Sequence, residues 1–162
     1  MEIVNRVSQS PLVTFKIEDY YPKGERKTLD IKDQLFQGLM LREKDFRAFI
    51  QAHDWKQYEN AYVAITCSAD AIVPVWAYML VGTRLSGIAA DFVFGTVSDL
   101  DNYLLNKGLD TIDFSVFTAK PVVIKGCSDV KIPISVYVEI TKRLKSFAKK
   151  ISYGEPCSTV PL

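Results

Sequence analysis

The chain has 162 residues, with 20 lysines and arginines against 19 aspartates and glutamates and a formal net charge of +1. This balance gives no global attraction to nucleic acid or to an anionic membrane, so we expect neither as a partner. Apolar residues make up 48% of the chain and charged residues 24%, which is typical of a soluble globular protein. The length is that of one ordinary domain, and we expect a single α/β domain over residues 1–162.

The chain shows no sign of export. No apolar run reaches the roughly 18 residues of a membrane-spanning helix. Residues 1–6 lack the basic region and apolar stretch of a secretory signal, so a cytoplasmic location is expected. Thiols stay reduced there, and an odd count of three cysteines also fits a disulfide framework poorly.

Apolar periodicity and turn residues predict strands and helices that alternate along the chain. In chain order, we expect a strand at residues 12–17, a short helix capped by Asp30, a helix at 43–53, a strand at 62–66, a helix opened by Pro74 and ended by Gly87, a strand at 92–94, a helix from Ser98 to Gly108, a strand at 122–125, a helix opened by Pro133 and a last strand at 151–153. Proline suits the first turn of a helix, where its missing N–H would be unpaired. The alternation predicts a three-layer α/β fold, a largely parallel sheet with helices on its faces.

The two halves of the chain resemble each other. The first half contains Asp54-Trp55, Tyr58, Val63-Ala64-Ile65, Cys67-Ser68, Pro74 and Tyr78. The second half contains Asp113-Phe114, Phe117, Val122-Val123-Ile124, Cys127-Ser128, Pro133 and Tyr137. The pattern suggests an internal duplication of about 60 residues, against the alternative of coincidence among common α/β patterns.

The cysteines mark the most distinctive candidate site. Cys67, Cys127 and Cys157 each end a predicted strand, and each is followed by a serine. Ligands of open parallel sheets bind beyond the carboxyl ends of the strands. Cys67 and Cys127 also lead into helix N-termini, where the dipole favours thiolate. We therefore expect the three thiols to share one sheet edge and one coordination sphere.

Three interpretations of these cysteines remain open. Zinc accepts three thiolates and a fourth ligand, and an iron–sulfur cluster can use three cysteines, so a small cytosolic metal- or iron–sulfur-binding protein is the leading prediction. A low-pKa cysteine could instead attack or carry sulfur in a thiol or sulfur-transfer enzyme. Cysteine is also a common packing residue, which would leave a non-catalytic interaction module with structural cysteines. The sequence does not decide whether the protein is an enzyme, nor its oligomeric state.

Asp70 and Asp129 lie in the loops after two of these cysteines and are the favoured further metal ligands, with helix capping as the alternative. The hydroxyls of Ser68, Ser128 and Ser158 could donate hydrogen bonds to thiolate sulfurs, with ordinary turn contacts as the alternative. His53, the single histidine, ends a helix at the opposite sheet edge and is expected to be a helix-terminal cation or a packing residue.

Five sequence blocks carry a family resemblance: Asp30-Ile31-Lys32, Glu43-Lys44-Asp45-Phe46-Arg47, residues 66–74 (TCSADAIVP), Lys125-Gly126-Cys127-Ser128 and residues 154–162 (GEPCSTVPL). With these blocks, essentially the whole chain resembles the domain-of-unknown-function 2480 family of Bacteroidota. The family has no established activity. Its genes are often found near those of iron–sulfur cluster assembly. The resemblance therefore implies iron–sulfur assembly proteins as partners.

Overall fold

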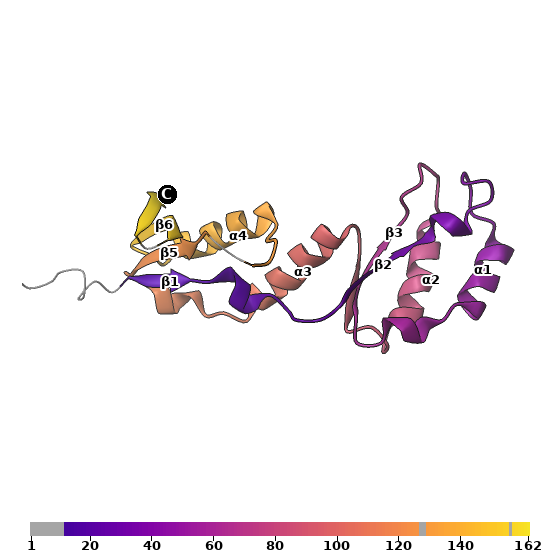
Figure 1. Ribbon diagram of the computed structural model, residues 1–162, viewed down its shortest axis with the longest axis horizontal. Helices are drawn as coiled ribbons and strands as arrows, with labels where there is room; N and C mark the ends of the chain where they lie inside the picture. Colours follow the sequence, from indigo (N-terminus) through magenta and orange to yellow (C-terminus); the bar gives the residue numbers. More distant parts are fainter. Residues whose placement is uncertain (1–11, 127–128, 156) are drawn as a thin grey trace, which may run out of the picture. The chain divides into compact units, whose positions relative to one another are not determined.

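The computed structural model describes residues 12–126, 129–155 and 157–162. Its elements in chain order are β1 (Val13–Phe15), η1 (Ile17–Tyr20), β2 (Arg26–Asp30), η2 (Ile31–Gln34), α1 (Glu43–Ala52), η3 (Trp55–Tyr58), β3 (Tyr62–Thr66), α2 (Val75–Leu85), β4 (Asp91–Phe94), α3 (Val97–Asp110), η4 (Phe114–Phe117), β5 (Pro121–Lys125), α4 (Ile134–Lys145), β6 (Lys150–Glu155) and β7 (Ser158–Pro161) (Figure 1). The α/β class is confirmed. None of the described helices is both long and apolar enough to cross a membrane.

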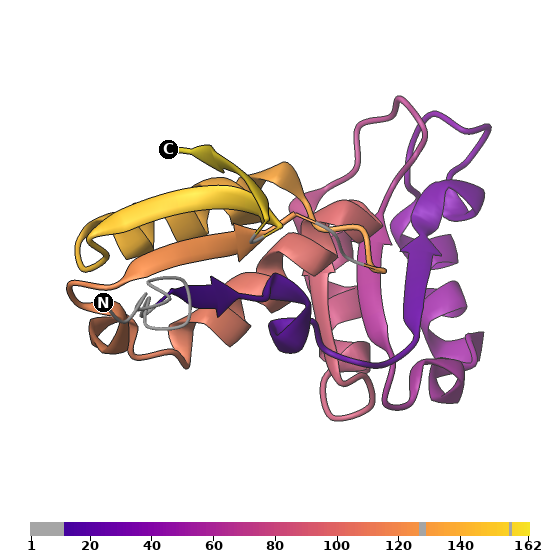
Figure 2. The same cartoon turned by 60° about the vertical axis from the view of Figure 1, so that its left-hand side comes forward.

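The chain divides into two compact units, each with its own sheet. Unit 1 comprises residues 1–22 and 104–162, and unit 2 comprises residues 23–103. The sheet of unit 1 has the order β1-β5-β6-β7, in which only β7 runs antiparallel to its neighbour (Figure 2). The sheet of unit 2 has the order β2-β3-β4 and is parallel throughout. The prediction of one sheet is therefore wrong, whereas single-domain organisation over residues 1–162 stays a prediction.

Each unit buries its own apolar core. In unit 2, Leu29 of β2 and Val63 and Ile65 of β3 pack with the buried faces of α1 and α2. In unit 1, Val122 and Ile124 of β5 pack with residues of α3, η4 and α4. Buried side chains four residues apart give each covering helix one buried stripe, which is Ala77, Val81 and Leu85 in α2 and Val136, Ile140 and Leu144 in α4. These separate cores explain why alternating apolar segments formed two sheets.

The two units repeat their local structure at positions 59 residues apart. Asp54 caps η3 by accepting a hydrogen bond from the backbone N–H of Lys56, and Asp113 caps η4 in the same way from Ser115. The strands β3 and β5 begin at residues 62 and 121, and the helices α2 and α4 follow N-caps at residues 74 and 133. The correspondence therefore runs through helix, strand and loop alike.

Backbone geometry follows the same interval further along the chain. The N–H of Ala90 donates to the carbonyl of Ala61 over 2.8 Å, and the N–H of Lys149 donates to that of Lys120 over 2.9 Å. Gly95 directly follows β4 and Gly154 lies within β6, with φ of 136° and 128°, a region that favours glycine. Because the interval is constant, Cys67 corresponds to Gly126 and not to Cys127, so the sequence-based pairing of these cysteines is wrong by one residue.

Several features depart from the predicted elements. The strands β2 and β7 and the short helices η1, η3 and η4 were not predicted. The helix α3 continues past Gly108 to Asp110, so this glycine does not end it. A Cβ at Gly108 would lie 3.0 Å from the carbonyl oxygen of Tyr20, which explains why a glycine stands inside the helix.

Candidate functional site

The two described cysteines, Cys67 and Cys157, do not share the predicted sheet edge. Cys67 directly follows β3 in the sheet of unit 2, and its thiol donates a weak hydrogen bond to the carbonyl of Ala69 over 3.8 Å. Cys157 is exposed in the turn before β7 in unit 1. Cys127 and Ser128 lie outside the described residues. The prediction of one coordination sphere assumed a single sheet, and two sheets remove its geometric basis.

Within residues 12–126, 129–155 and 157–162, no group of three or more His, Cys, Asp or Glu side chains could hold a metal ion. This finding overturns the predicted metal- or iron–sulfur-binding function. Zinc or an iron–sulfur cluster as a cofactor is not tested by this finding and stays a prediction. Asp70 and Asp129 are both exposed. The helices after their loops are capped by Pro74 and Pro133 without a side-chain hydrogen bond, so these aspartates do not cap them either.

Ser68 binds a carboxylate and not the thiol beside it. Its hydroxyl donates to Oδ2 of Asp30 over 2.5 Å, and its backbone N–H donates to Oδ1 over 3.1 Å. The backbone N–H of Lys32 donates to the same Oδ1 over 3.0 Å, which caps η2. Asp30 therefore ties the end of β2 to the loop after β3. Ser158, at the start of β7, is exposed.

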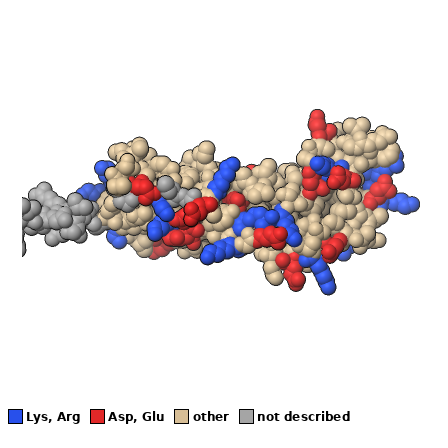
Figure 3. Space-filling view, in the orientation of Figure 1, with Lys and Arg blue, Asp and Glu red and all other residues tan. Residues whose placement is uncertain are grey.

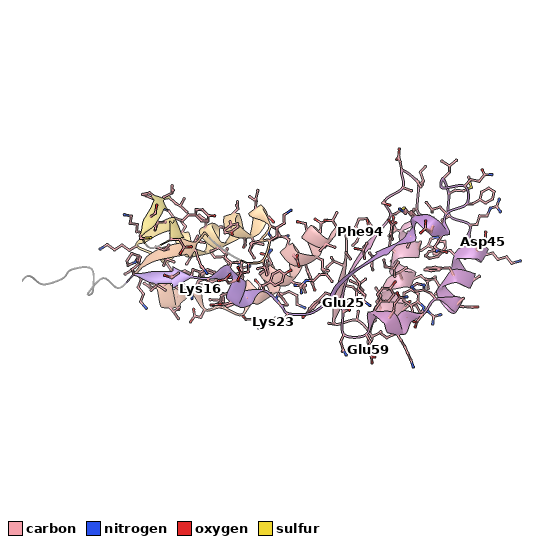
Figure 4. The ribbon with its side chains drawn as sticks, in the orientation of Figure 1. Lys16, Lys23, Glu25, Asp45, Glu59 and Phe94 are labelled. Atoms are coloured by element: carbon pink, nitrogen blue, oxygen red, sulfur yellow. The ribbon has the colours of Figure 1, made fainter. Side chains whose placement is uncertain are left out.

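The ionisation of Asp30 follows from these contacts. Its partial burial favours the neutral acid, but the hydrogen bonds from Ser68 and Lys32 outweigh that effect and lower its pKa. Tyr78 of α2 lies near this group, and its pKa is raised by burial, with smaller contributions from the charges of Cys67 and Asp30. The Tyr78 ring meets that of Phe94 edge-on, with centroids 4.9 Å apart. Phe94 is the last residue of β4 and is labelled in Figure 4.

His53 is a packing residue. It follows the last turn of α1, and its Nε2 lies 3.0 Å from the hydroxyl of Tyr58. Its ring also packs against those of Phe49 and Trp55, with centroids 4.7 Å and 4.9 Å away. Burial lowers the pKa of His53, although the charge of Asp54 opposes this. These contacts agree with the packing interpretation of His53.

An apolar groove of about 420 Å³ lies in unit 1. It is lined by side chains from β5, α4, β6 and β7 and by the residue after β7: Ile124, Ile134, Tyr137, Val138, Thr141, Tyr153, Val160 and Leu162. The rings of Tyr137 and Tyr153 meet nearly at right angles, with centroids 5.8 Å apart. The hydroxyl of Thr141 donates to the carbonyl of Tyr137 within α4, so it adds no free polar group to the groove.

The groove walls remain open to solvent. Ile134 is 81% exposed, Val138 64%, Val160 61% and Leu162 64%. Scattered apolar side chains on a surface need no explanation, but four that line one concavity indicate a binding surface. The sequence analysis did not predict this site. Ile134 and Val138, one turn apart and outside the buried stripe of α4, were the available signal.

A second cavity continues from the groove. It measures about 350 Å³ and shares Thr141 and Leu162 with the groove, and its other lining residues are Lys145, Ala148, Lys149, Lys150 and Ile151. The three lysines are exposed. Among the described residues, no ion pair involves any of them. The apolar groove thus ends beside three lysines that pair with no carboxylate of the described residues.

Unit 2 carries a similar apolar face, but this face lacks a wall like the one that Val160 and Leu162 form in unit 1. Val75, Tyr78, Met79 and Phe94 precede Ile134, Tyr137, Val138 and Tyr153 by 59 positions. Val75 is 73% exposed, Met79 66% and Phe94 65%. Within residues 23–103, all of which the structure describes, no strand corresponds to β7, because α3 begins two residues after Gly95. The wall formed by Val160 and Leu162 is therefore particular to unit 1.

The sequence matches one family over residues 1–162, and that family is described as "Protein of unknown function (DUF2480)". No curated protein and no solved structure matches the chain significantly. The match confirms the family resemblance, while its restriction to Bacteroidota stays a prediction. Because the match spans the whole chain, the protein belongs to the DUF2480 family of proteins of unknown function.

Proposed function

We propose that the protein binds an apolar segment of a partner protein in the groove of unit 1. The observation that carries this proposal is the 61–81% exposure of Ile134, Val138, Val160 and Leu162 around one concavity. Covering these side chains would remove apolar surface from water, which is favourable by about 25 cal/mol per Å². The Thr141 hydroxyl is bonded within α4 and the Tyr153 hydroxyl donates to the carbonyl of Gly126, so neither of these polar groups opposes this.

A protein segment suits this groove better than a small molecule does. Small-molecule sites enclose most of the ligand surface and combine apolar walls with a few convergent polar groups. Here the walls are mostly exposed, so a small ligand would stay largely in water. A longer segment could insert apolar side chains between α4 and β7 and cover the rims with its remaining surface.

The mixed charge on the face drawn in Figure 3 does not favour a nucleic-acid partner for this function. Lysine and arginine side chains are interspersed with aspartate and glutamate over the face drawn in Figure 3. Nucleic-acid sites instead gather basic residues into one stripe or patch. We place the interaction in the cytoplasm. The proteins of iron–sulfur cluster assembly, which the family resemblance implies as partners, are the first whose segments should be tested.

The test is a methyl NMR titration of the full chain, labelled at Ile, Leu and Val, with a synthetic peptide that carries three leucines in a neutral Gly-Ser background. We expect shifts at Ile134, Val138, Val160 and Leu162. Val138→Glu should weaken binding at least about tenfold, because it places a charge in the apolar contact. Its matched control is Met79→Glu, at the corresponding position of unit 2, which should leave the affinity unchanged.

Both substitutions are at exposed positions, so stability should change by no more than about 0.5 kcal/mol, which thermal unfolding would check. Shifts that spread away from the groove would contradict the proposal. So would an affinity that Val138→Glu leaves intact.

A further inference from the structure

Two adjoining cavities on α4 and β6 differ in chemistry. The groove is apolar, whereas the cavity that shares Thr141 and Leu162 with it is lined by Lys145, Lys149 and Lys150. A segment that lies in the groove and continues past Leu162 would therefore meet three ammonium groups. Since no carboxylate pairs with them among the described residues, these charges are available to a ligand.

The helix dipole does not explain this lysine group. Cations are favoured in the last turn of a helix, which accounts for Lys145 at the end of α4. Lys149 precedes β6 and Lys150 opens it, so neither is part of that helix. The neighbouring Arg143 is different, because it is already paired with Asp110 and Glu139 at 2.7 Å and 2.9 Å.

The fold does not require these lysines either. The corresponding residues of unit 2, 59 positions earlier, are Ser86, Ala90 and Asp91. The same helix–strand connection therefore forms without any of the three positive charges. The exposed apolar residues of α2 and α4 are common to both units, whereas the lysines accompany only the groove that β7 completes. This association points to the ligand as the reason for the lysines.

We infer that the partner segment carries acidic residues on one side of its apolar anchors, with their carboxylates against Lys145, Lys149 and Lys150. This inference rests on the proposed function of the groove. Carboxylates complement exposed lysines, speed encounter and fix the direction of the bound segment. An anionic membrane offers similar charge, but a concave groove receives protruding side chains, whereas a lipid surface requires apolar side chains that protrude from the protein.

The test uses three fluorescent peptides with one apolar core: acidic residues after the core, acidic residues before it, and lysines after it. We expect the full chain to bind one of the two acidic peptides about tenfold more tightly than it binds the lysine peptide. This difference in affinity should be smaller at 0.5 M salt. Lys145→Glu, Lys149→Glu and Lys150→Glu together should reverse this preference. The control exchanges exposed Lys16, Lys44 and Lys56 for Glu, which changes the net charge equally and should keep the preference.

The outcomes separate the two proposals. If Val138→Glu abolishes binding of every peptide but the flanking charges make no difference, the inference is overturned and the groove function stands. If Val138→Glu leaves binding intact, the groove function itself fails. Vesicles of phosphatidylcholine and phosphatidylglycerol provide a further arm. If the vesicles bind in a lysine-dependent way and the chain shows no preference among the peptides, the ligand of the lysines is an anionic membrane and not an acidic segment.

Discussion

The hydroxyl of Ser68 donates a 2.5 Å hydrogen bond to Oδ2 of Asp30, which joins the loop after β3 to the end of β2. Backbone N–H groups of Ser68 and Lys32 donate to the other oxygen of the same carboxylate. One side chain thus holds two loops at the carboxyl edge of the sheet of unit 2. A serine expected to face a thiolate is in fact a structural contact of a carboxylate.

Asp30→Ala should lower the free energy of unfolding by about 1 kcal/mol, because it removes three charge-assisted hydrogen bonds at a partly exposed site. Asp30→Asn, which keeps an acceptor oxygen, should cost less. Urea denaturation of the full chain would measure both values. Asp70→Asn, an exposed control in the same region, should change stability little. Equal stability of Asp30→Ala and the unchanged chain would refute this role.

Asp30 should also make stability depend on pH in the acid range. Its pKa is lower in the folded state than the ordinary value of 3.8, so the folded state favours the ionised form. The stabilisation is present above the unfolded pKa and is lost as the pH falls through the folded-state pKa. Between pH 6 and pH 2, the free energy of unfolding should therefore change less with pH for Asp30→Asn than for the unchanged chain. Parallel curves would contradict this prediction.

His53 should add a second pH dependence near neutrality. Burial lowers its pKa from the ordinary 6.5, so protonation favours the unfolded chain. The stability that neutral His53 contributes is fully present above about pH 6.5 and is lost as the pH falls below this value. His53→Gln should remove the difference in stability between pH 7.5 and pH 5.5. As the chain has one histidine, this window isolates its titration. An unchanged difference in His53→Gln would assign the effect to another group.

Two helical glycines should respond oppositely to alanine. In Gly108→Ala the new Cβ would lie 3.0 Å from the carbonyl oxygen of Tyr20, and the required shift should cost about 1–3 kcal/mol. In Gly82→Ala the Cβ would meet only the Phe92 ring at 3.4 Å, and the gain in helix propensity is up to about 1 kcal/mol. Thermal unfolding of both variants measures the contrast. A Gly108→Ala variant as stable as Gly82→Ala would show that α3 does not pack so closely on Tyr20.

Sequence patterns predicted some helices and strands of this protein and missed others. The helices α2 and α4 were predicted to begin at Pro74 and Pro133, and both prolines are the N-caps. The strand β2 was missed because Arg26–Asp30 has one buried apolar residue, Leu29, and its charged side chains look like a turn. The strand β7 was missed because all four residues are exposed and it contains Pro161, which only an edge strand accommodates easily.

The candidate site was harder to predict than the fold. The cysteines were predicted to form one site because each ends a predicted strand. That prediction required every strand to join one sheet. The groove depends instead on Val160 and Leu162, which lie opposite Tyr153 and Ile151 only through the pairing of β6 with β7. Apolar periodicity in the sequence does not predict that pairing. The lysine group likewise depends on tertiary structure, since Lys145 ends α4, Lys149 precedes β6 and Lys150 opens it.

The sequence by itself determined the α/β class, the positions of the helices and the membership of the DUF2480 family. These follow from local patterns: apolar spacing, proline and glycine punctuation, and motif identity. Only the tertiary structure decided that the strands form two sheets, that Ser68 binds Asp30 and that α4, β6 and β7 enclose an apolar groove beside three lysines. The reason is physical, because strand partners are chosen by long-range backbone pairing and core packing, which a local pattern does not encode.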